Sequence, residues 1–208
     1  MAAIPYRIET PRLVIRCLHP TDAGLMQTAI SESLMHLRPW MPWAQAEPIS
    51  MEARVSLLRQ FRAQFDSDQD YTFGIFDPQE TRLLGGSGLH KRRGPQALEV
   101  GYWIHVAETG KGLATEVTRA LTEAAFALHG VRWVELRCDP QNLASQAVPR
   151  KLGFSHEATL KQRDTTALGE LRDTMVWSLF KADYQAQTQA EIDTRYFDAT
   201  GAEISIAR

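Results

Sequence analysis

The hydrophobic positions of this chain recur with two different spacings, which alternate from one end of the sequence to the other. Segments in which apolar and polar residues alternate predict strands, and segments with an apolar residue every three or four positions predict amphipathic helices. Strands that alternate with helices are typical of a layered α/β domain. Expected strands cover residues 12–17, 71–76, 83–91, 98–106, 132–138, 156–163 and 171–180. Expected helices follow residue 22, cover residues 50–65, run from residue 113 to a glycine at 130, and begin again after residue 142.

A glycine-rich turn connects the strand at 98–106 to the helix that follows it. Its sequence is Thr109-Gly110-Lys111-Gly112, and it continues into Leu113-Ala114-Thr115-Glu116. Glycine allows the backbone to approach a ligand closely, and the first turn of a helix leaves N–H groups and a partial positive charge unpaired. The segment predicts an anion-binding turn with phosphate as the usual ligand, although an ordinary solvent-exposed turn explains it equally well.

Two familiar phosphate-binding motifs do not match this turn. Nucleoside triphosphatases require a Ser or Thr directly after the lysine, and here Lys111 is followed by Gly112. The dinucleotide fingerprint requires a third glycine, and Thr115 holds its place. Nucleotide hydrolysis and dinucleotide binding are therefore not expected.

A second polar segment follows the strand at 132–138. It begins with Asn142-Leu143-Ala144-Ser145 and ends with Arg150-Lys151-Leu152-Gly153-Phe154. Asn and Ser are preferred helix caps, so capping alone explains Asn142 and Ser145. Pro149 removes one helical hydrogen bond, which predicts a short or kinked helix and leaves the carbonyl of Ser145 without its usual partner.

In this order, the glycine turn, the Asn142–Ser145 segment and the Arg150–Phe154 segment resemble the GNAT superfamily of acetyl-CoA-dependent N-acetyltransferases. Residues 9–16, 37–43 and 99–103 are similar, more narrowly, to its RimJ/RimL-type branch, named for enzymes that acetylate the N-termini of ribosomal proteins. The resemblance extends over roughly residues 8 to 184. It implies a single domain over residues 1–184, with a central mixed, twisted sheet of about seven strands flanked by about four helices.

The resemblance also implies that acetyl-CoA is the co-substrate and that the glycine turn holds its pyrophosphate. The neighbouring strand is implied to splay at its end, where its backbone groups bind the pantetheine arm and the thioester oxygen. Lys111 is expected either to add charge or to be solvated. The family usually has Arg or Gln where Thr109 stands, so CoA binding is expected to survive but to be weakened. The expected CoA-binding residues are Trp103, Ile104, His105, Val106, Gly110, Lys111, Gly112, Leu113, Ala114, Thr115, Asn142 and Lys151.

Ser145 and Glu99 are the expected catalytic residues. The resemblance implies that Ser145 hydrogen-bonds the CoA sulfur and protonates the departing thiolate. Glu99 precedes the part of the strand that is implied to splay and is the candidate general base, since an amine arrives mostly protonated at neutral pH. A structural carboxylate paired with Arg92 or Arg93 is an equally good interpretation of Glu99. Two histidines, His90 and His105, are weaker candidates for the base.

Two tryptophans flank a proline-rich segment between the first two expected helices, where the family places its acceptor pocket. Trp40 and Trp43 are therefore expected, with Glu99, to contact the acceptor, although Trp is more often a core residue. The expected reaction transfers an acetyl group from acetyl-CoA to a primary amine, with a protein or peptide N-terminus favoured. Direct attack is expected, because no cysteine is placed to carry the acyl group. Three alternatives stay open: a small amine or antibiotic as acceptor, another acyl donor, and a non-catalytic acyl-CoA-binding module.

Composition narrows the class of protein without changing this picture. Hydrophobic residues make up 44% of the chain and charged residues 23%, as in soluble globular proteins. The net charge of −2 argues against a general nucleic-acid-binding protein. Cys17 and Cys138 lie far apart, so both are expected to be buried thiols and no metal is expected. No secretory signal and no membrane-spanning stretch is visible, which makes a cytoplasmic protein the expectation and leaves a homodimer open.

The last part of the chain, residues 185–208, changes character. Residues 185–190 are polar, and the stretch from 194 to 206 is expected to form a hairpin that turns at Asp198–Gly201. An isolated hairpin is only marginally stable, so this extension is expected to dock on the domain or on a second subunit.

Overall fold

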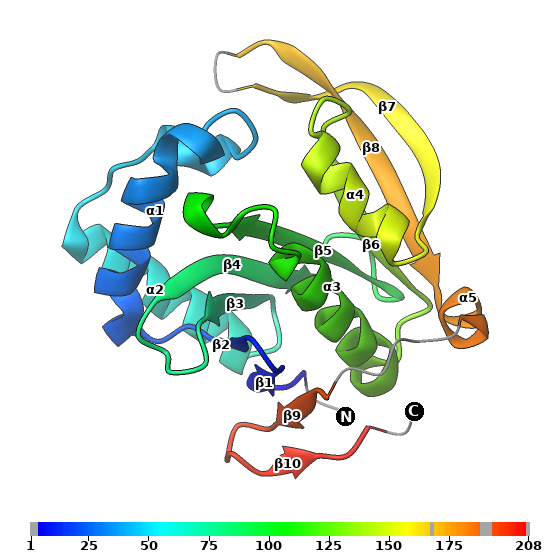
Figure 1. Ribbon diagram of the computed structural model, residues 1–208, viewed down its shortest axis with the longest axis horizontal. Helices are drawn as coiled ribbons and strands as arrows, with labels where there is room; N and C mark the ends of the chain where they lie inside the picture. The colour runs from blue at the N-terminus through cyan, green and yellow to red at the C-terminus, as the bar shows by residue number, and fades with distance from the viewer. Residues whose placement is uncertain (1–3, 167–168, 188–192, 207–208) are drawn as a thin grey trace.

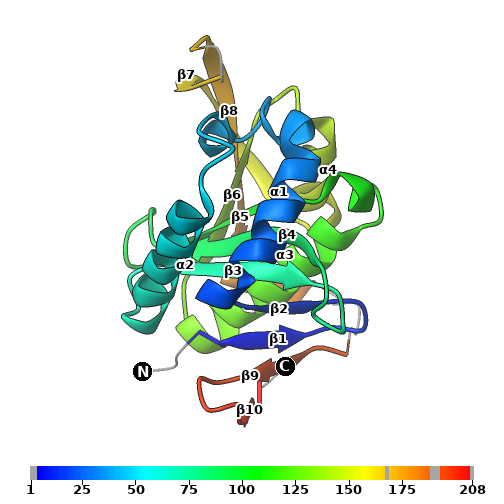
Figure 2. The same cartoon turned by 90° about the vertical axis from the view of Figure 1, so that its left-hand side faces the viewer.

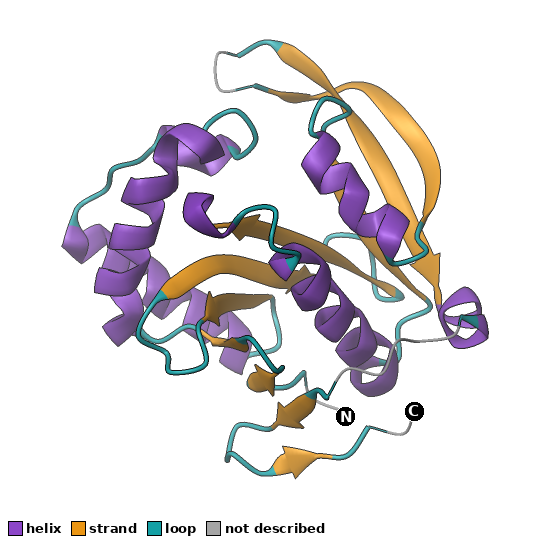
Figure 3. Cartoon of the chain, in the orientation of Figure 1, coloured by secondary structure: helices purple, strands orange, loops and turns teal. Residues whose placement is uncertain are grey.

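One mixed sheet runs through the molecule and carries helices on both faces (Figure 1; Figure 3). The computed structural model describes residues 4–166, 169–187 and 193–206. Across the sheet, the ten strands of these ranges follow the order β10-β9-β1-β2-β3-β4-β5-β6-β8-β7. The strands are β1 (Arg7–Glu9), β2 (Val14–Cys17), β3 (Tyr71–Phe76), β4 (Leu83–His90), β5 (Ala97–Ile104), β6 (Trp133–Cys138), β7 (Ser155–Thr165), β8 (Leu171–Phe180), β9 (Arg195–Phe197) and β10 (Glu203–Ile204). The α-helices are α1 (Ala23–Leu37), α2 (Met51–Asp66), α3 (Leu113–Ala124), α4 (Leu143–Lys151) and α5 (Lys181–Ala186), and a π-helical turn at Ala125–His129 continues α3.

All seven expected strands are present, and three short strands extend the sheet beyond them. β1 and β9 have three residues each and β10 has two, too few to display a two-residue period in the sequence. The expected count of about seven strands is therefore too low. α1, α2, α3 and α4 correspond to the expected helices, and the six-residue α5 is an addition. None of the helices in the described ranges is long and apolar enough to cross a membrane.

The sheet separates two hydrophobic cores, because neighbouring residues on a strand point to opposite faces. Val14 on β2 belongs to the core that contains Ile30 of α1, whereas Ile15 belongs to the core that contains Leu121 of α3. Val148 of α4 lies in the second core as well. α1 therefore covers one face of the sheet, and α3 and α4 cover the other.

The sheet opens between β5 and β6, which form the one parallel pair among the described strands. The two strands pair from Ala97–Trp133 to Val100–Leu136, although β5 continues to Ile104 and β6 to Cys138. Beyond Val100, β5 pairs with no described strand on that side. The implied splay is confirmed. Because α3 follows β5 and α4 follows β6, both helix N-termini lie at this opening, which we call the notch (Figure 1).

The expected C-terminal hairpin is formed by β9 and β10, and it docks on its own domain (Figure 2). β9 pairs with β1 from Arg7–Phe197 to Glu9–Arg195, so the hairpin extends the sheet at its edge. Tyr196 of β9 is 2% exposed, and its hydroxyl donates a 2.7 Å hydrogen bond to Glu123 of α3. The hairpin thus completes the core on the α3 face. Part of the polar connection, residues 188–192, lies outside the described residues, and the domain boundary at residue 184 stays a prediction.

Tyr196→Ala is expected to lower the free energy of unfolding by about 3 kcal/mol or more, the usual cost of truncating a large buried aromatic side chain. Tyr196→Phe keeps the ring and removes only the hydroxyl contacts, so it should cost about 1 kcal/mol. Chemical denaturation measures both variants. Wild-type stability of Tyr196→Ala would show that the hairpin does not dock in solution.

Candidate active site

A cavity of about 630 Å³ lies between α1, the strands β3–β5 and the open end of the sheet. Gly74, Gly85, Gly86 and Gly101 contribute to its lining. A Cβ atom on Gly86 would lie only 2.5 Å from Nε1 of Trp103. Glycine at 86 therefore makes room for the Trp103 indole, which also lines the cavity.

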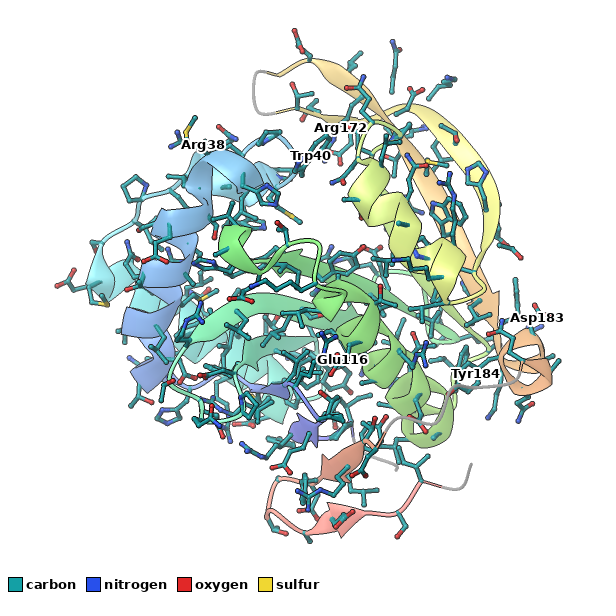
Figure 4. The ribbon with its side chains drawn as sticks, in the orientation of Figure 1. Arg38, Trp40, Glu116, Arg172, Asp183 and Tyr184 are labelled. Atoms are coloured by element: carbon teal, nitrogen blue, oxygen red, sulfur yellow. The ribbon has the colours of Figure 1, made fainter. Side chains whose placement is uncertain are left out.

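Both tryptophans expected at the acceptor site line this cavity. Trp43 is 40% exposed, and its ring lies edge-to-face with that of Trp103 at 6.1 Å between centroids, so it is not a core anchor. The carbonyl of Trp40 accepts a 3.4 Å hydrogen bond from Arg172 of β8, and Figure 4 shows the two residues side by side. This contact connects the segment between α1 and α2 with the β7–β8 hairpin. Binding of the acceptor by Trp40 and Trp43 stays a prediction.

The first turn of α3 presents unpaired backbone donors at the notch. Gly112 is its N-cap residue, with φ of 80°, and Gly110 also has a positive φ of 76°. The first helical hydrogen bond runs from the N–H of Glu116 to the carbonyl of Gly112, at 3.1 Å. The N–H groups of residues 113–115 precede that bond, so the helix offers them no acceptor and adds the positive end of its dipole. This geometry fits the pyrophosphate of CoA.

Contacts from the β1–β2 turn hold the glycine turn in place. Arg12 donates to the carbonyl of Lys111 at 2.9 Å and to the carboxylate of Glu116 at 2.7 Å. The hydroxyl of Thr10 donates to the other oxygen of Glu116 at 2.6 Å. Figure 4 shows Glu116 beneath α3, where its carboxylate is buried. The sequence contains Thr10 and Arg12 in a segment typical of the family, but no pattern in it indicates that they brace the turn.

Other polar side chains near the notch either contact neighbouring protein groups or are exposed to solvent. Lys111 is exposed, with Nζ 2.8 Å from the carboxylate of Glu108. The hydroxyl of Thr109 donates to the carbonyl of Val106 at 2.9 Å and so closes the turn. Lys151 is exposed at the end of α4. Contact of Lys111 and Lys151 with CoA stays a prediction.

The end of β5 has fewer unpaired backbone donors than expected. The N–H of His105 donates to a carbonyl of β4 at 2.8 Å, and that of Val106 donates to Oγ of Ser33 at 3.1 Å. The His105 imidazole is also occupied, since it lies 2.8 Å from a carboxylate of α1. Backbone groups alternate in direction along a strand, so the N–H groups of Tyr102 and Ile104 are the ones that face the notch. Contact of His105 and Val106 with CoA stays a prediction, and their N–H groups are engaged within the protein.

Ser145 lies at the notch and forms a pair with Tyr102, which the sequence analysis did not single out. The hydroxyl oxygens of the two residues are 3.0 Å apart. Asn142 is the N-cap of α4 and accepts a 3.0 Å hydrogen bond from the N–H of Ser145, so capping explains Asn142 but not the Ser145 hydroxyl. Burial raises the pKa of Tyr102, and the hydrogen bond with Ser145 only partly offsets this. Tyr102 therefore keeps its proton at neutral pH.

Pro149 contributes to this pair. It lies inside α4 four residues after Ser145, so the carbonyl of Ser145 receives no helical N–H. The hydroxyl of Tyr102 lies 3.3 Å from that carbonyl, in donor geometry. The Ser145 carbonyl, which lacks a helical partner, therefore helps to hold the Tyr102 hydroxyl beside the Ser145 side chain.

Glu99 lines the cavity, as expected, but its carboxylate is engaged. One oxygen is bound by Arg93, and the other lies 3.5 Å from Arg92. The ion-paired interpretation of Glu99 is therefore present in the structure, and its role as the base stays a prediction.

The position of Cys138 differs from the expectation that no cysteine lies near the site. Both cysteines are buried free thiols, as expected, but Cys138 lines the cavity together with Ser145, so a cysteine is near the site after all. Burial raises the pKa of the Cys138 thiol, which disfavours the nucleophilic thiolate. Among the described residues, no group of three or more His, Cys, Asp and Glu side chains is arranged to hold a metal ion.

Comparisons with known proteins agree with this geometry. The family model of the acetyltransferase (GNAT) domain matches residues 12–155. YjcK, a probable N-acetyltransferase of Bacillus subtilis (strain 168), is 28% identical over 82% of this chain and 95% of its own. The ribosomal protein uS5-alanine N-acetyltransferase of Escherichia coli (strain K12) is 28% identical over 86% of this chain and 92% of its own.

Among solved structures, the ribosomal L7/L12 alpha-N-protein acetyltransferase RimL in complex with coenzyme A superimposes with a TM-score of 0.74. It is 20% identical, and the match covers 87% of this chain and 98% of RimL, so the two share a fold. Since the family model spans more than half of the sequence, the chain belongs to the GNAT acetyltransferase family.

Proposed function

We propose that this protein transfers the acetyl group of acetyl-CoA to the α-amine at the N-terminus of a protein or peptide. The observation that carries the proposal is the position of β5 between two compartments. Its open edge faces the notch at the start of α3, and its residues 99–103 line the cavity of about 630 Å³. A donor in the notch and an acceptor in the cavity would therefore meet at one strand. The relative named for the alanine of ribosomal protein uS5 supports a protein N-terminus as the acceptor.

Acetyl-CoA supplies the acyl group as a thioester. The N–H groups of residues 113–115 hold its pyrophosphate, and the pantetheine arm lies along the open edge of β5 as an added strand would. The N–H groups of Tyr102 and Ile104 face the same opening and are available to the thioester oxygen, on which negative charge develops during attack.

The chemistry then needs one bond formed and one broken. The amine nitrogen attacks the carbonyl carbon, and the carbon–sulfur bond breaks when the tetrahedral intermediate collapses. The Ser145 hydroxyl gives its proton to the thiolate and is reprotonated through Tyr102, whose oxygen lies 3.0 Å away. The nitrogen loses its protons to a base and to this relay, so the products are an amide, free CoA and one released proton.

The acceptor class is tested by measuring CoA release with a panel of peptides that differ only at the N-terminus. A peptide with a free α-amine should release CoA and become acetylated there, as mass spectrometry of its fragments shows. The matched control is the same peptide with a formylated N-terminus and a free lysine side chain, which should not react. Transfer to small amines but to no peptide would overturn the proposed acceptor class.

Cys138→Ser tests the order of events. Direct attack predicts that kcat and the KM for acetyl-CoA stay within about twofold of wild type, because the buried thiol with its raised pKa carries no acyl group. Initial-rate plots against both substrates should intersect. Parallel lines, together with loss of activity in Cys138→Ser, would show that an acetyl-cysteine intermediate forms instead.

A further inference from the structure

We propose that His90 is the general base that deprotonates the acceptor amine, and that Asp70 is its positioning residue. This inference rests on the proposed function, since it names the group that prepares the nucleophile. His90 ends β4 and Asp70 directly precedes β3, so the two meet across neighbouring strands. Both residues line the cavity in which the acceptor is expected.

The contact between the two side chains defines which nitrogen of His90 acts. Nδ1 lies 2.7 Å from a carboxylate oxygen of Asp70. Burial alone would raise the pKa of Asp70, but the hydrogen bond and charge of His90 outweigh it and hold that pKa below its usual value. Asp70 is therefore ionised at neutral pH and accepts the Nδ1 proton. A neutral His90 in this tautomer carries its lone pair on Nε2.

Two glycines place Nε2 on the floor of the cavity. A Cβ atom on Gly88 would lie 2.5 Å from Nε2, and one on Gly101 would lie 3.4 Å from it. The imidazole thus rests on bare backbone of β4 and β5. No side chain or backbone group in the described part of the chain forms a hydrogen bond with Nε2. Its lone pair is available to a ligand in the cavity.

Glu99, the other candidate base, lies directly across from His90 in the β4–β5 register, on the same face of the sheet. One of its carboxylate oxygens is bound by Arg93, and the other lies 3.5 Å from Arg92. Of the two carboxylates beside His90, Asp70 forms a hydrogen bond with its ring, and Glu99 is paired with the arginines. His90 is the group with an unoccupied basic atom.

His90 takes one proton from the acceptor amine and later releases it to solvent. An α-amine has a pKa of about 8, so the acceptor arrives mostly as an ammonium at neutral pH. Nε2 takes one proton, the amine nitrogen gains the lone pair that attacks the thioester, and the Asp70 carboxylate stabilises the imidazolium. After the amide has formed, the imidazolium returns its proton to solvent.

The test measures kcat/KM for a reactive N-terminal peptide as a function of pH, in wild type, His90→Gln, Asp70→Asn and Glu99→Gln. His90→Gln is expected to lose about 10²- to 10³-fold at neutral pH, with an unchanged dissociation constant for acetyl-CoA. The deficit should shrink above about pH 9, where the amine loses its proton unaided. Asp70→Asn should show a smaller loss of the same kind, and added imidazole should restore part of the activity of His90→Ala.

A purely structural role for His90 would produce a loss that neither high pH nor imidazole relieves, and that result would overturn the inference. A wild-type pH profile of kcat/KM in His90→Gln would also overturn it. The same holds if Glu99→Gln is the one variant in which the fall in kcat/KM at low pH disappears. In those cases wild-type turnover of the peptide leaves the proposed function standing. If wild type itself acetylates no N-terminal peptide, both proposals fail.

Discussion

Ser145→Ala is expected to lower kcat by about 10²-fold and to leave the dissociation constant of acetyl-CoA within about twofold of wild type. In the proposed mechanism the hydroxyl of Ser145 donates the proton at the notch, so its loss would force the thiolate to leave unprotonated. Its side chain caps nothing, since Asn142 caps α4, and the helix should therefore stay intact. CoA release under saturating substrates gives kcat, and calorimetric titration gives the dissociation constant.

Tyr102→Phe provides the second arm of a double-mutant cycle. Because Tyr102 is proposed to act through Ser145, its removal should slow the reaction by about tenfold in the wild-type background and hardly at all in Ser145→Ala. Pro149→Ala should slow the reaction less than Tyr102→Phe does. It returns a helical N–H to the carbonyl of Ser145, and this N–H competes with the Tyr102 hydroxyl for that carbonyl. Additive losses in the double variant would show that the two hydroxyls act independently and would contradict the proposed relay.

Gly112→Val is expected to raise the dissociation constant of acetyl-CoA by about tenfold to 10²-fold, equivalent to about 1–3 kcal/mol of backbone strain. Gly112 has φ of 80°, which a β-branched residue adopts only with strain, and its carbonyl accepts the first hydrogen bond of α3. Relief of that strain would redirect the N–H groups of residues 113–115 away from a common point. Calorimetric titration with acetyl-CoA measures the change.

Gly201→Val is the matched control. Gly201 has φ of 83° in the turn between β9 and β10, and space is open around its Cβ position. It carries the same strain far from the notch, so it should reduce stability without weakening acetyl-CoA binding. Equal weakening in both variants would attribute the effect to general destabilisation, and normal binding by Gly112→Val would remove the glycine turn from the donor site.

The pattern of the sequence predicts the main elements because each has its own period. The strands β3 to β6 and the apolar stripe of α3, which includes Val117 and Leu121, are long enough to display one. β1, β9 and β10 are not, and they form because their neighbours offer backbone partners. The register of β5 with β6, which opens the notch after Val100, is a property of the assembled sheet and follows from no local pattern.

The site was predictable where one segment carries it, as in the glycine turn and Ser145. It was not predictable where two distant segments meet. Tyr102 faces Ser145 across 43 positions, and Asp70 meets His90 across 20. One signal was nevertheless present, since glycines at 86, 88 and 101 within strands indicate that something lies close to the backbone. The structure shows that Trp103 and His90 occupy that space.

The most direct test of this account is the structure of the protein with a bisubstrate analogue, in which an acetyl bridge joins the CoA sulfur to the N-terminal nitrogen of a peptide. We expect the pyrophosphate within hydrogen-bond distance of the N–H groups of residues 113–115 and the sulfur beside Oγ of Ser145. The peptide nitrogen should lie next to Nε2 of His90, in the cavity lined by Trp40 and Trp43. A pyrophosphate bound away from the start of α3, or a peptide outside that cavity, would contradict the account.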